Sequence, residues 1–197
     1  MLIDFLYKVD LGLFRFINGT LQNPVFDAFF PFITDLNRIR LVLYAVILIL
    51  LWMLVHKSKT TRLAALLLIL TILIGDQLNS FVIKFILERT RPCHSLVHVH
   101  LLVGCGSGYS FPSSHAVNNF AGALILAYFF PRGKWWLFGF ASLVAFSRIY
   151  VGVHYPSDVA GGAVIGLSIA SAVLFFAYLV EQSWHRFISP KKKSTRD

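Results

Sequence analysis

Three short groups of polar residues interrupt an otherwise apolar chain, and the first is Lys84 with Arg91 and Pro92. Lys84 and Arg91 are seven positions apart, so on a continuing helix they are offset by only about 20° and share a face. Two cations near a bilayer surface can hold two oxygens of one phosphate, and Pro92 would end the helix. The alternative is that the Lys84 side chain extends to the membrane–water interface and that Arg91 anchors the helix end there.

The second group, Pro112, Ser113, Ser114 and His115, directly precedes an apolar segment. Serine is a favoured N-cap, and the free amides at a helix start form an anion site together with the helix dipole. A histidine at this position can exchange a proton with a bound anion. The simpler alternative is an ordinary capped helix with an interfacial histidine.

The third group consists of Ser147, Arg148, His154 and Asp158. An arginine inside an apolar helix needs an anionic partner or a polar cavity. Asp158 follows His154 by four residues across a proline turn, so its carboxylate can hold the Nδ1 proton and leave Nε2 as a nucleophile. The alternative is a buried structural hydrogen bond, but one phosphate site would explain all three groups together.

The composition places these groups in a membrane protein, because 57% of the 197 residues are hydrophobic and only 14% are charged. The 18 basic and 9 acidic residues give a net charge of +9. The basic residues lie between apolar segments or at the C-terminus, which favours orientation in a bilayer over binding of nucleic acid. No cleavable signal peptide is expected, because charges interrupt the first 22 residues.

The apolar segments predict an all-α fold, a polytopic membrane helix bundle with five to six transmembrane helices. Apolar residues at near-helical spacing in 1–22 predict an additional interfacial helix at the N-terminus. For the range 24–33 the sequence allows two outcomes, a short sixth helix inserted in the membrane or a segment that does not insert. The whole chain, 1–197, is expected to form one domain: the interfacial helix 1–22, the catalytic bundle 39–181 and a basic cytoplasmic tail 182–197. The five expected spans are 39–55, 63–87, 116–130, 135–153 and 159–180.

Basic residues in the short loops predict the orientation of these spans. They lie in two turns and in the tail, which should all be cytoplasmic: Lys57, Lys59, Arg62, Arg132, Lys134, Lys191, Lys192, Lys193 and Arg196. The ranges 88–111 and 153–158 then meet at the outer face.

In order and spacing, the three polar groups resemble the three-part signature of the type 2 phosphatidic acid phosphatase family. That family includes membrane lipid phosphatases, glucose-6-phosphatase and the vanadium haloperoxidases. The motifs cover 84–158, and one position departs from the pattern, because Ser114 stands where the family has glycine. Since this position contributes a backbone amide, we expect less space in the pocket but retained activity.

The resemblance implies a metal-independent mechanism without a cofactor. His154 would attack phosphorus, Asp158 would orient it, and His115 would protonate the leaving group and later activate water. The phosphate oxygens would be held by Lys84, Arg91, Arg148, Ser113 and the amide of Ser114.

The expected activity is hydrolysis of a lipid phosphate or diphosphate at the outer face of a bacterial plasma (inner) membrane. The active site would face the periplasm or cell exterior and the C-terminus the cytoplasm. The partners would be the substrate and membrane lipids, with no nucleic acid and no protein partner. There are four candidate substrates. We favour undecaprenyl diphosphate, and the 1-phosphate of lipid A comes next. The other two are phosphatidylglycerol phosphate and phosphatidate.

Two other functions remain open. The same residues would serve a lipid-to-lipid phosphotransferase, whereas an anion or lipid transporter would need the cations but not the pairing of His154 with Asp158. A haloperoxidase is not expected, because those family members resemble soluble helical proteins.

Three further features carry weaker signals. Cys93 and Cys105 are expected either to form a disulfide or to remain free thiols. Three histidines of the outer loop, His94, His98 and His100, have a spacing that suits a lid better than a zinc site. Gln77, Ser80 and Lys84 lie on roughly one helical face with Asp76 nearby, which indicates a polar stripe below the site. The alternative is that Asp76 forms a hydrogen bond to a neighbouring helix.

Overall fold

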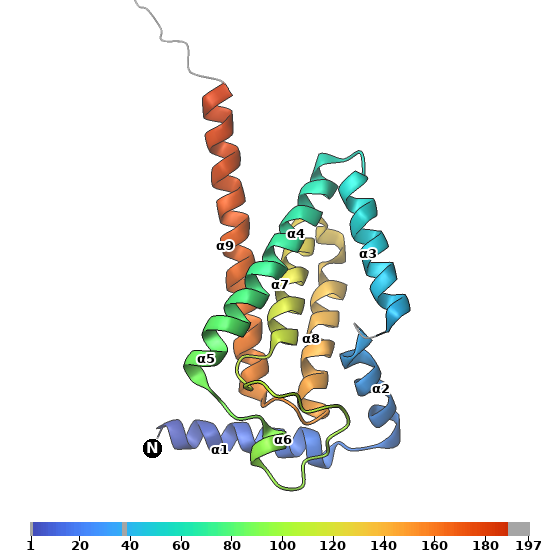
Figure 1. The fold of residues 1–197 in the computed structure, drawn as a ribbon, viewed down its shortest axis with the longest axis vertical. Helices are drawn as coiled ribbons and strands as arrows, with labels where there is room; N and C mark the ends of the chain where they lie inside the picture. The colour runs from blue at the N-terminus through green and yellow to red at the C-terminus, as the bar shows by residue number, and fades with distance from the viewer. Residues whose placement is uncertain (1, 37–38, 189–197) are drawn as a thin grey trace, which may run out of the picture.

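The computed structural model describes residues 2–36 and 39–188, and all regular elements in these ranges are helices (Figure 1). They are α1 (Leu2–Arg15), η1 (Phe16–Thr20), α2 (Pro24–Thr34), α3 (Arg40–Val55), α4 (Lys59–Leu78), η3 (Asn79–Ile83), α5 (Lys84–Leu87), α6 (Pro92–Ser95), α7 (Ser114–Phe129), η4 (Pro131–Gly133), α8 (Lys134–Tyr150) and α9 (Pro156–Ile188).

Helix α7 lies at the centre of the bundle, because it packs against α4, α8 and α9. Leu67 of α4, Ile125 of α7 and Val173 of α9 meet in the main apolar cluster. Helix α3 packs on α4, and α2 packs on α8. Helix α1 crosses one end of the bundle and contacts the start of α9 (Figure 1). The α3–α4 and α7–α8 connections lie at the opposite end.

Small residues let α7 and α9 approach each other closely. A Cβ added at Gly166 would overlap the backbone carbonyl of Val117, and one at Gly162 would lie 2.8 Å from the carbonyl oxygen of Ser113. Helix pairs in membranes use such contacts because apolar side chains gain little by leaving lipid for a helix interface. The two helices that carry the second and third polar groups are therefore held at a fixed separation.

The surface of the bundle is strongly apolar. Large hydrophobic side chains are exposed along the outward faces of α3, α4 and α9, among them Leu48, Leu66 and Phe176. By length and composition, two helical segments could cross a membrane, Lys59–Ser95 and Pro156–Trp184, and α3 is a shorter apolar helix. Helix α2 has 11 residues, about 16 Å, so it is too short to cross a hydrocarbon core of roughly 30 Å.

The expected continuous helix through Lys84 and Arg91 is wrong. Helices α4, η3 and α5 are continuous from Lys59 to Leu87, but the chain then turns at Glu88, which has a left-handed φ of 41°. Arg91 is the N-cap of the separate helix α6, and Pro92 is its first residue. Pro92 therefore begins a helix instead of ending one, and Lys84 and Arg91 reach the same region from different segments.

Helix α9 also extends further than expected. It continues past residue 180 to Ile188, so the first part of the range 182–197, which we expected to be a tail, is helical. The basic cluster at 191–196 lies outside the described residues.

The close approach of α7 and α9 predicts that Gly166→Leu lowers stability. The new side chain would collide with the Val117 backbone, and overpacking of this kind costs about 1–3 kcal/mol. Thermal unfolding in detergent should give a lower Tm for this variant than for Gly139→Leu, where an added Cβ meets nothing within 4 Å. An equal Tm for the two variants would contradict the packing argument.

Candidate active site

The three polar groups meet at the end of the bundle crossed by α1. Five of the eight expected site residues are buried there, and their side chains are at most 9% exposed: Arg91, Ser113, Arg148, His154 and Asp158. The other three, Lys84, Ser114 and His115, are partly buried. Electrostatic interactions join these residues across the motifs, since Lys84 interacts with Arg91, Arg148 and Asp158, and His115 interacts with Arg148, His154 and Arg91.

A tight turn between α8 and α9 places His154. The carbonyl of Arg148 accepts hydrogen bonds from the amides of Val153 and His154, both at 3.2 Å. The turn needs a glycine at position 152, because its φ is +87° and a Cβ would lie 2.9 Å from the carbonyl oxygen of His100. His154 is thus fixed beside the end of α8 and beneath the outer loop.

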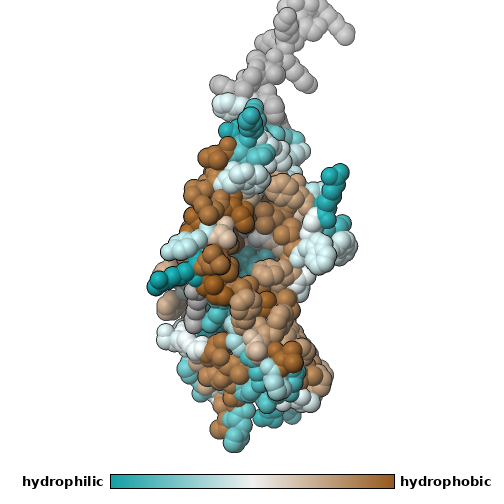
Figure 2. All heavy atoms as spheres, turned by 90° about the vertical axis from the view of Figure 1, so that its right-hand side faces the viewer, coloured by the Kyte–Doolittle hydropathy of each residue, from teal (hydrophilic) through white to brown (hydrophobic). Residues whose placement is uncertain are grey.

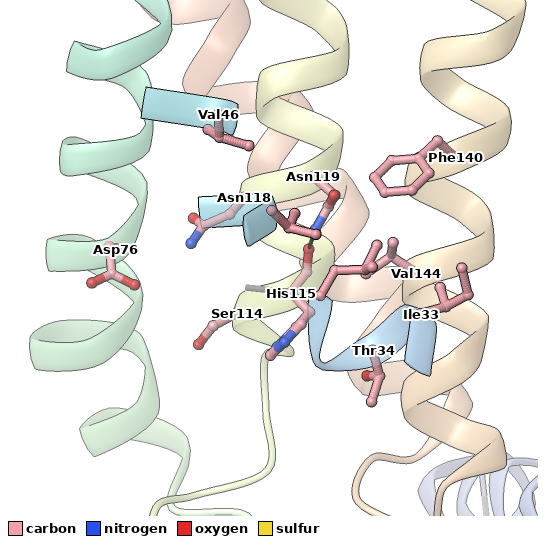
Figure 3. Close-up of a pocket in the computed structure, with 12 residues that line it drawn as sticks. Ile33, Thr34, Val46, Asp76, Ser114, His115, Asn118, Asn119, Phe140 and Val144 are labelled. Carbon is pink, nitrogen blue, oxygen red and sulfur yellow. Dashed lines mark hydrogen bonds between the residues drawn. The ribbon is translucent and has the colours of Figure 1, made fainter. Parts of the chain in front are cut away.

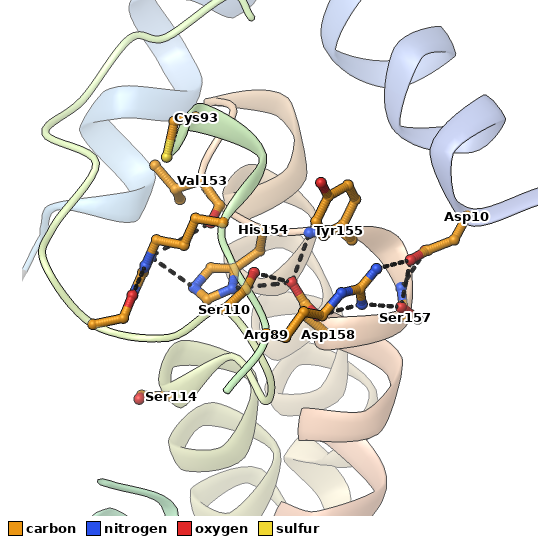
Figure 4. Close-up of polar contacts among 12 residues, drawn as sticks. Asp10, Arg89, Cys93, Ser110, Ser114, Val153, His154, Tyr155, Ser157 and Asp158 are labelled. Carbon is orange, nitrogen blue, oxygen red and sulfur yellow. Dashed lines mark hydrogen bonds and ion pairs between the residues drawn. The ribbon is translucent and has the colours of Figure 1, made fainter. Parts of the chain in front are cut away.

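The two nitrogens of His154 face different partners (Figure 4). Nδ1 lies 3.5 Å from Oδ2 of Asp158, and Nε2 lies 3.3 Å from Nη1 of Arg91. Arginine can only donate, so Nε2 accepts and the proton of the neutral ring is on Nδ1, facing the carboxylate. This arrangement gives Nε2 the free electron pair that a nucleophile requires.

Burial lowers the pKa of His154 to about 4. Asp158 opposes this effect, whereas Arg91 and Arg148 add to it. The imidazole is therefore neutral at pH 7, which keeps Nε2 available for attack on phosphorus.

Asp158 is held by three donors in addition to its approach to His154. Nη1 of Arg89 donates to Oδ1 at 2.6 Å, while the Tyr155 amide at 2.8 Å and the Ser110 hydroxyl donate to Oδ2. The carboxylate is fully buried, so these contacts replace the hydration that it loses. Its position beneath the imidazole is consequently fixed.

The arginines are positioned by neutral acceptors. Nη1 of Arg148 donates to the hydroxyl of Thr34 on α2 at 2.6 Å, and Nε of Arg91 donates to the carbonyl of Gly108 at 2.7 Å. Neither of these contacts neutralises a guanidinium. Both guanidinium groups are permanently charged, so each is suited to binding a phosphate oxygen.

Ser113 is the N-cap of α7, as expected, but its hydroxyl does not cap the helix. The hydroxyl is buried and has no hydrogen-bond partner among the described residues, while its amide donates to the carbonyl of Asp158 at 3.1 Å. The hydroxyl of Ser114 accepts a 2.7 Å hydrogen bond from the Asn79 side chain. A serine at this position thus ties α7 to the membrane helix that carries Lys84.

Arg89 and Asp10 belong to none of the three expected groups, yet both contact the site. Nη2 of Arg89 lies 2.5 Å from Asp10 on α1, so one guanidinium joins α1 to Asp158. Asp10 also accepts hydrogen bonds from the amide and hydroxyl of Ser157 at the start of α9, at 2.8 and 2.6 Å. The only sequence signal was an acidic residue within the apolar pattern of 1–22.

The outer loop is held by a disulfide between Cys93 and Cys105. His94 lies beside the disulfide, His100 pairs with Asp27 at 3.0 Å, and His98 is exposed. The three histidines of the loop therefore do not converge on a point where they could bind one metal ion. Cys93, His94 and Cys105 are close enough to form a metal site, but both sulfurs are used in the disulfide.

Comparison with known proteins matches residues 64–184 to the family model described as "PAP2 superfamily". A lipid A 4'-phosphatase of Bacteroides thetaiotaomicron is 34% identical over 84% of this chain and 75% of its own. The undecaprenyl-diphosphatase BcrC of Bacillus subtilis is 32% identical over 84% and 82%. The crystal structure of Aquifex aeolicus LpxE is similar with a TM-score of 0.67 and 29% identity, covering 84% of this chain and 94% of that one.

The contacts of Arg89 predict that Arg89→Gln lowers kcat by up to about 100-fold while KM changes little, because a misplaced Asp158 no longer orients His154. Asp10→Asn should have a smaller effect. Since Asp10 reaches Asp158 through Arg89, the two effects should not add fully, and the double variant should be slower than Arg89→Gln by less than the effect of Asp10→Asn alone. Steady-state kinetics would test this with the exposed Arg132→Gln as the control, and a native kcat in Arg89→Gln would refute it.

The environment of His154 predicts that kcat/KM falls on the acid side only at low pH. As the pH falls through the pKa of His154, about 4, the proton occupies the nucleophile and the rate falls. Arg91→Gln removes a cation beside Nε2, so its acid limb should move to higher pH. The substrate ionises in the same way in both assays, so a difference between the two profiles comes from the enzyme. Coincident profiles of the native protein and Arg91→Gln would contradict the assignment of the acid limb to His154.

Proposed function

The chain belongs to the PAP2 superfamily and is a hydrolase that acts on lipid phosphates, and from this premise we propose that it works through a phosphohistidine at His154. The observation that carries the proposal is the orientation of His154. Nδ1 faces a buried carboxylate, and Nε2 lies beside a guanidinium that can bind the phosphate under attack.

In the first step, Nε2 of His154 forms a bond to phosphorus while the bond from phosphorus to the lipid oxygen breaks. His115 supplies the proton that the departing oxygen needs, and the Nδ1 proton of His154 stays near Asp158 as the ring becomes positively charged. The products of this step are a lipid alcohol, or a lipid monophosphate from a diphosphate, and phosphorylated His154.

In the second step, water attacks the phosphohistidine and His115 accepts its proton. The bond between Nε2 and phosphorus breaks, and inorganic phosphate leaves.

Charge in both transition states is carried by the equatorial oxygens. The groups in position to bind these oxygens are Lys84, Arg91, Arg148, the hydroxyl of Ser113 and the amide of Ser114 at the start of α7. Positive charge is abundant in this cluster, so the chain itself supplies the neutralisation that phosphoryl transfer requires. We expect hydrolysis to need no added metal ion.

The membrane arrangement that we propose has five spans, formed by α3, the helix from Lys59 to Leu87, α7, α8 and α9. The 16 or 17 residues of α3, α7 and α8 reach about 24–26 Å and need little extension to cross. Lys57, Arg132 and Lys134 lie in the connections at the end opposite the site (Figure 1). That charge placement supports a cytoplasmic position for this end and an external position for the site.

The proposed interfacial helix is α1. It crosses the end of the bundle at the site, with Phe5, Leu6 and Leu13 exposed and Asp10 and Phe14 buried against the protein. Such a helix would lie in the headgroup layer of the outer leaflet, at the depth where the phosphate of a lipid substrate lies.

The proposal predicts that the purified native chain releases inorganic phosphate from lipid phosphates in detergent with EDTA present. His154→Ala should reduce the rate at least about 1,000-fold, because the covalent route needs the imidazole. His98→Ala, which removes an exposed histidine of the outer loop, is the matched control and should keep the native rate.

Acid quenching of the native reaction with a labelled phosphate should also trap an acid-labile, alkali-stable phosphoprotein, absent from His154→Ala. Equal rates in native and His154→Ala protein would refute the phosphohistidine. Phosphate recovered on a second lipid instead of water would assign the phosphotransferase activity, and binding without any turnover would favour transport.

A further inference from the structure

Thr34, the last residue of α2, is buried although it belongs to none of the three expected groups, and only 2% of it is exposed. A cavity of about 480 Å³ beside His115 has both Thr34 and His115 in its lining (Figure 3). Seen from the side of α2 and α3, hydrophilic atoms lie at the bottom of a hollow whose rim is hydrophobic (Figure 2). The end of α2 therefore reaches a polar region beneath an apolar surface.

The hydroxyl of Thr34 holds Arg148. Its oxygen accepts a 2.6 Å hydrogen bond from Nη1 of Arg148, and the arginine is itself only 7% exposed. Removing an acceptor from a buried guanidinium is costly, so this contact restricts where the Arg148 side chain can lie. The contact is made across a helix boundary, from α2 to α8.

The backbone carbonyl of Thr34 faces His115. It accepts a hydrogen bond from the imidazole of His115. The last carbonyls of a helix have no partner within the helix, so the end of α2 offers an acceptor without any acidic side chain. With one ring nitrogen turned to this carbonyl, the other is left for the departing oxygen and later for water. A histidine that acts first as acid and then as base requires this orientation.

Both groups that Thr34 offers are neutral. The C-terminal end of a helix carries a partial negative charge, which favours a nearby guanidinium and a protonated imidazole. A carboxylate at this place would form an ion pair with Arg148 and compete with phosphate for it. A threonine at the end of α2 can hold the arginine without adding an opposing charge to the site.

Helix α2 is fixed against the end of α8 that carries Arg148. The ring centroids of Phe30 and Tyr150 are 4.6 Å apart, and the hydroxyl of Tyr150 donates to Asp27 at 2.6 Å. Tyr150 follows Arg148 by two positions. The same end of α8 therefore fixes α2 and receives the hydroxyl of Thr34.

We propose that Thr34 is a positioning residue, whose hydroxyl places Arg148 for the phosphate oxygens and whose carbonyl places His115 for proton transfer. This inference rests on the proposed function. Thr34 lies outside the residues 64–184 that match the family model. The short helix α2 is thereby part of the framework of the active site.

The first experiment measures kcat/KM of Thr34→Val and Thr34→Ser with a lipid phosphate in detergent. Valine keeps the shape and the backbone carbonyl but removes the acceptor for Arg148, so kcat/KM should fall about tenfold or more. Serine keeps the hydroxyl and should restore most of the native value. Thr71→Val is the matched control and should keep the native kcat/KM, because Thr71 is also buried but its hydroxyl donates within its own helix, to the carbonyl of Leu67.

The affinity for inorganic phosphate separates positioning from loss of folded enzyme, because a dissociation constant does not depend on the folded fraction. Calorimetry should show phosphate binding to Thr34→Val about tenfold more weakly than to the native chain or to Thr71→Val, since a displaced Arg148 binds it less well. In an Arg148→Met background, Thr34→Val should have little further effect on affinity or kcat/KM, because the side chain that the hydroxyl holds is absent.

The tautomer of His115 tests the carbonyl contact. ¹⁵N NMR of histidine-labelled protein, at a pH where the ring is neutral, should show one fixed tautomer of His115 in the native chain and in Thr34→Val, which keeps the carbonyl. The signals are assigned by their loss in His115→Gln. Signals that average the two tautomers would contradict the carbonyl contact.

Native kcat/KM and native phosphate affinity in Thr34→Val would overturn the inference while leaving the phosphatase intact. An equal loss from Thr34→Val in the native and Arg148→Met backgrounds would do the same, because the hydroxyl would then not act through the arginine. Absence of phosphate release by the native enzyme would instead refute the proposed function. In that case the phosphate affinity of Thr34→Val still decides whether Thr34 positions Arg148.

Discussion

The constraint on which the site depends is the burial of the Asp158 carboxylate. A fully buried carboxylate must be surrounded by donors, and here they come from distant parts of the chain: Arg89, Ser110 and the amide of Tyr155. Arg89 in turn contacts Asp10 of α1, which lies 79 positions earlier in the chain. One buried charge beside the proposed nucleophile therefore joins the segment 88–113, α1 and α9.

The other polar groups in these apolar surroundings also need hydrogen-bond partners. Arg148 near the end of α8 requires Thr34 of α2, and Asn79 in the long helix requires Ser114 of α7. In each case a polar side chain that would be unfavourable in lipid makes a hydrogen bond across a helix boundary. The hydrogen bonds that make these residues tolerable also fix the helices that position the phosphate site.

The sequence predicts those parts of the site whose residues lie close together in the chain. His154 and Asp158 are close in the chain, and serines before an apolar segment mark the start of α7. Arg89 and Asp10 were missed because 79 positions separate them and no periodicity marks the pair. The end of the helix at Glu88 was missed for another reason, because a glutamate with positive φ gives no glycine signal to read. The all-helical fold followed from the length of the apolar segments, whereas the termini of the helices depended on tertiary contacts.

The groups proposed to bind phosphate come from several helices, since Lys84 lies on α5, Ser114 on α7 and Arg148 on α8. The cavity of about 480 Å³ beside His115 is lined in part by Val42 and Val46 of α3, and α3 packs on α4 at the periphery of the bundle. Substitutions at these two positions can therefore change the shape of the cavity without touching the groups proposed to bind phosphate.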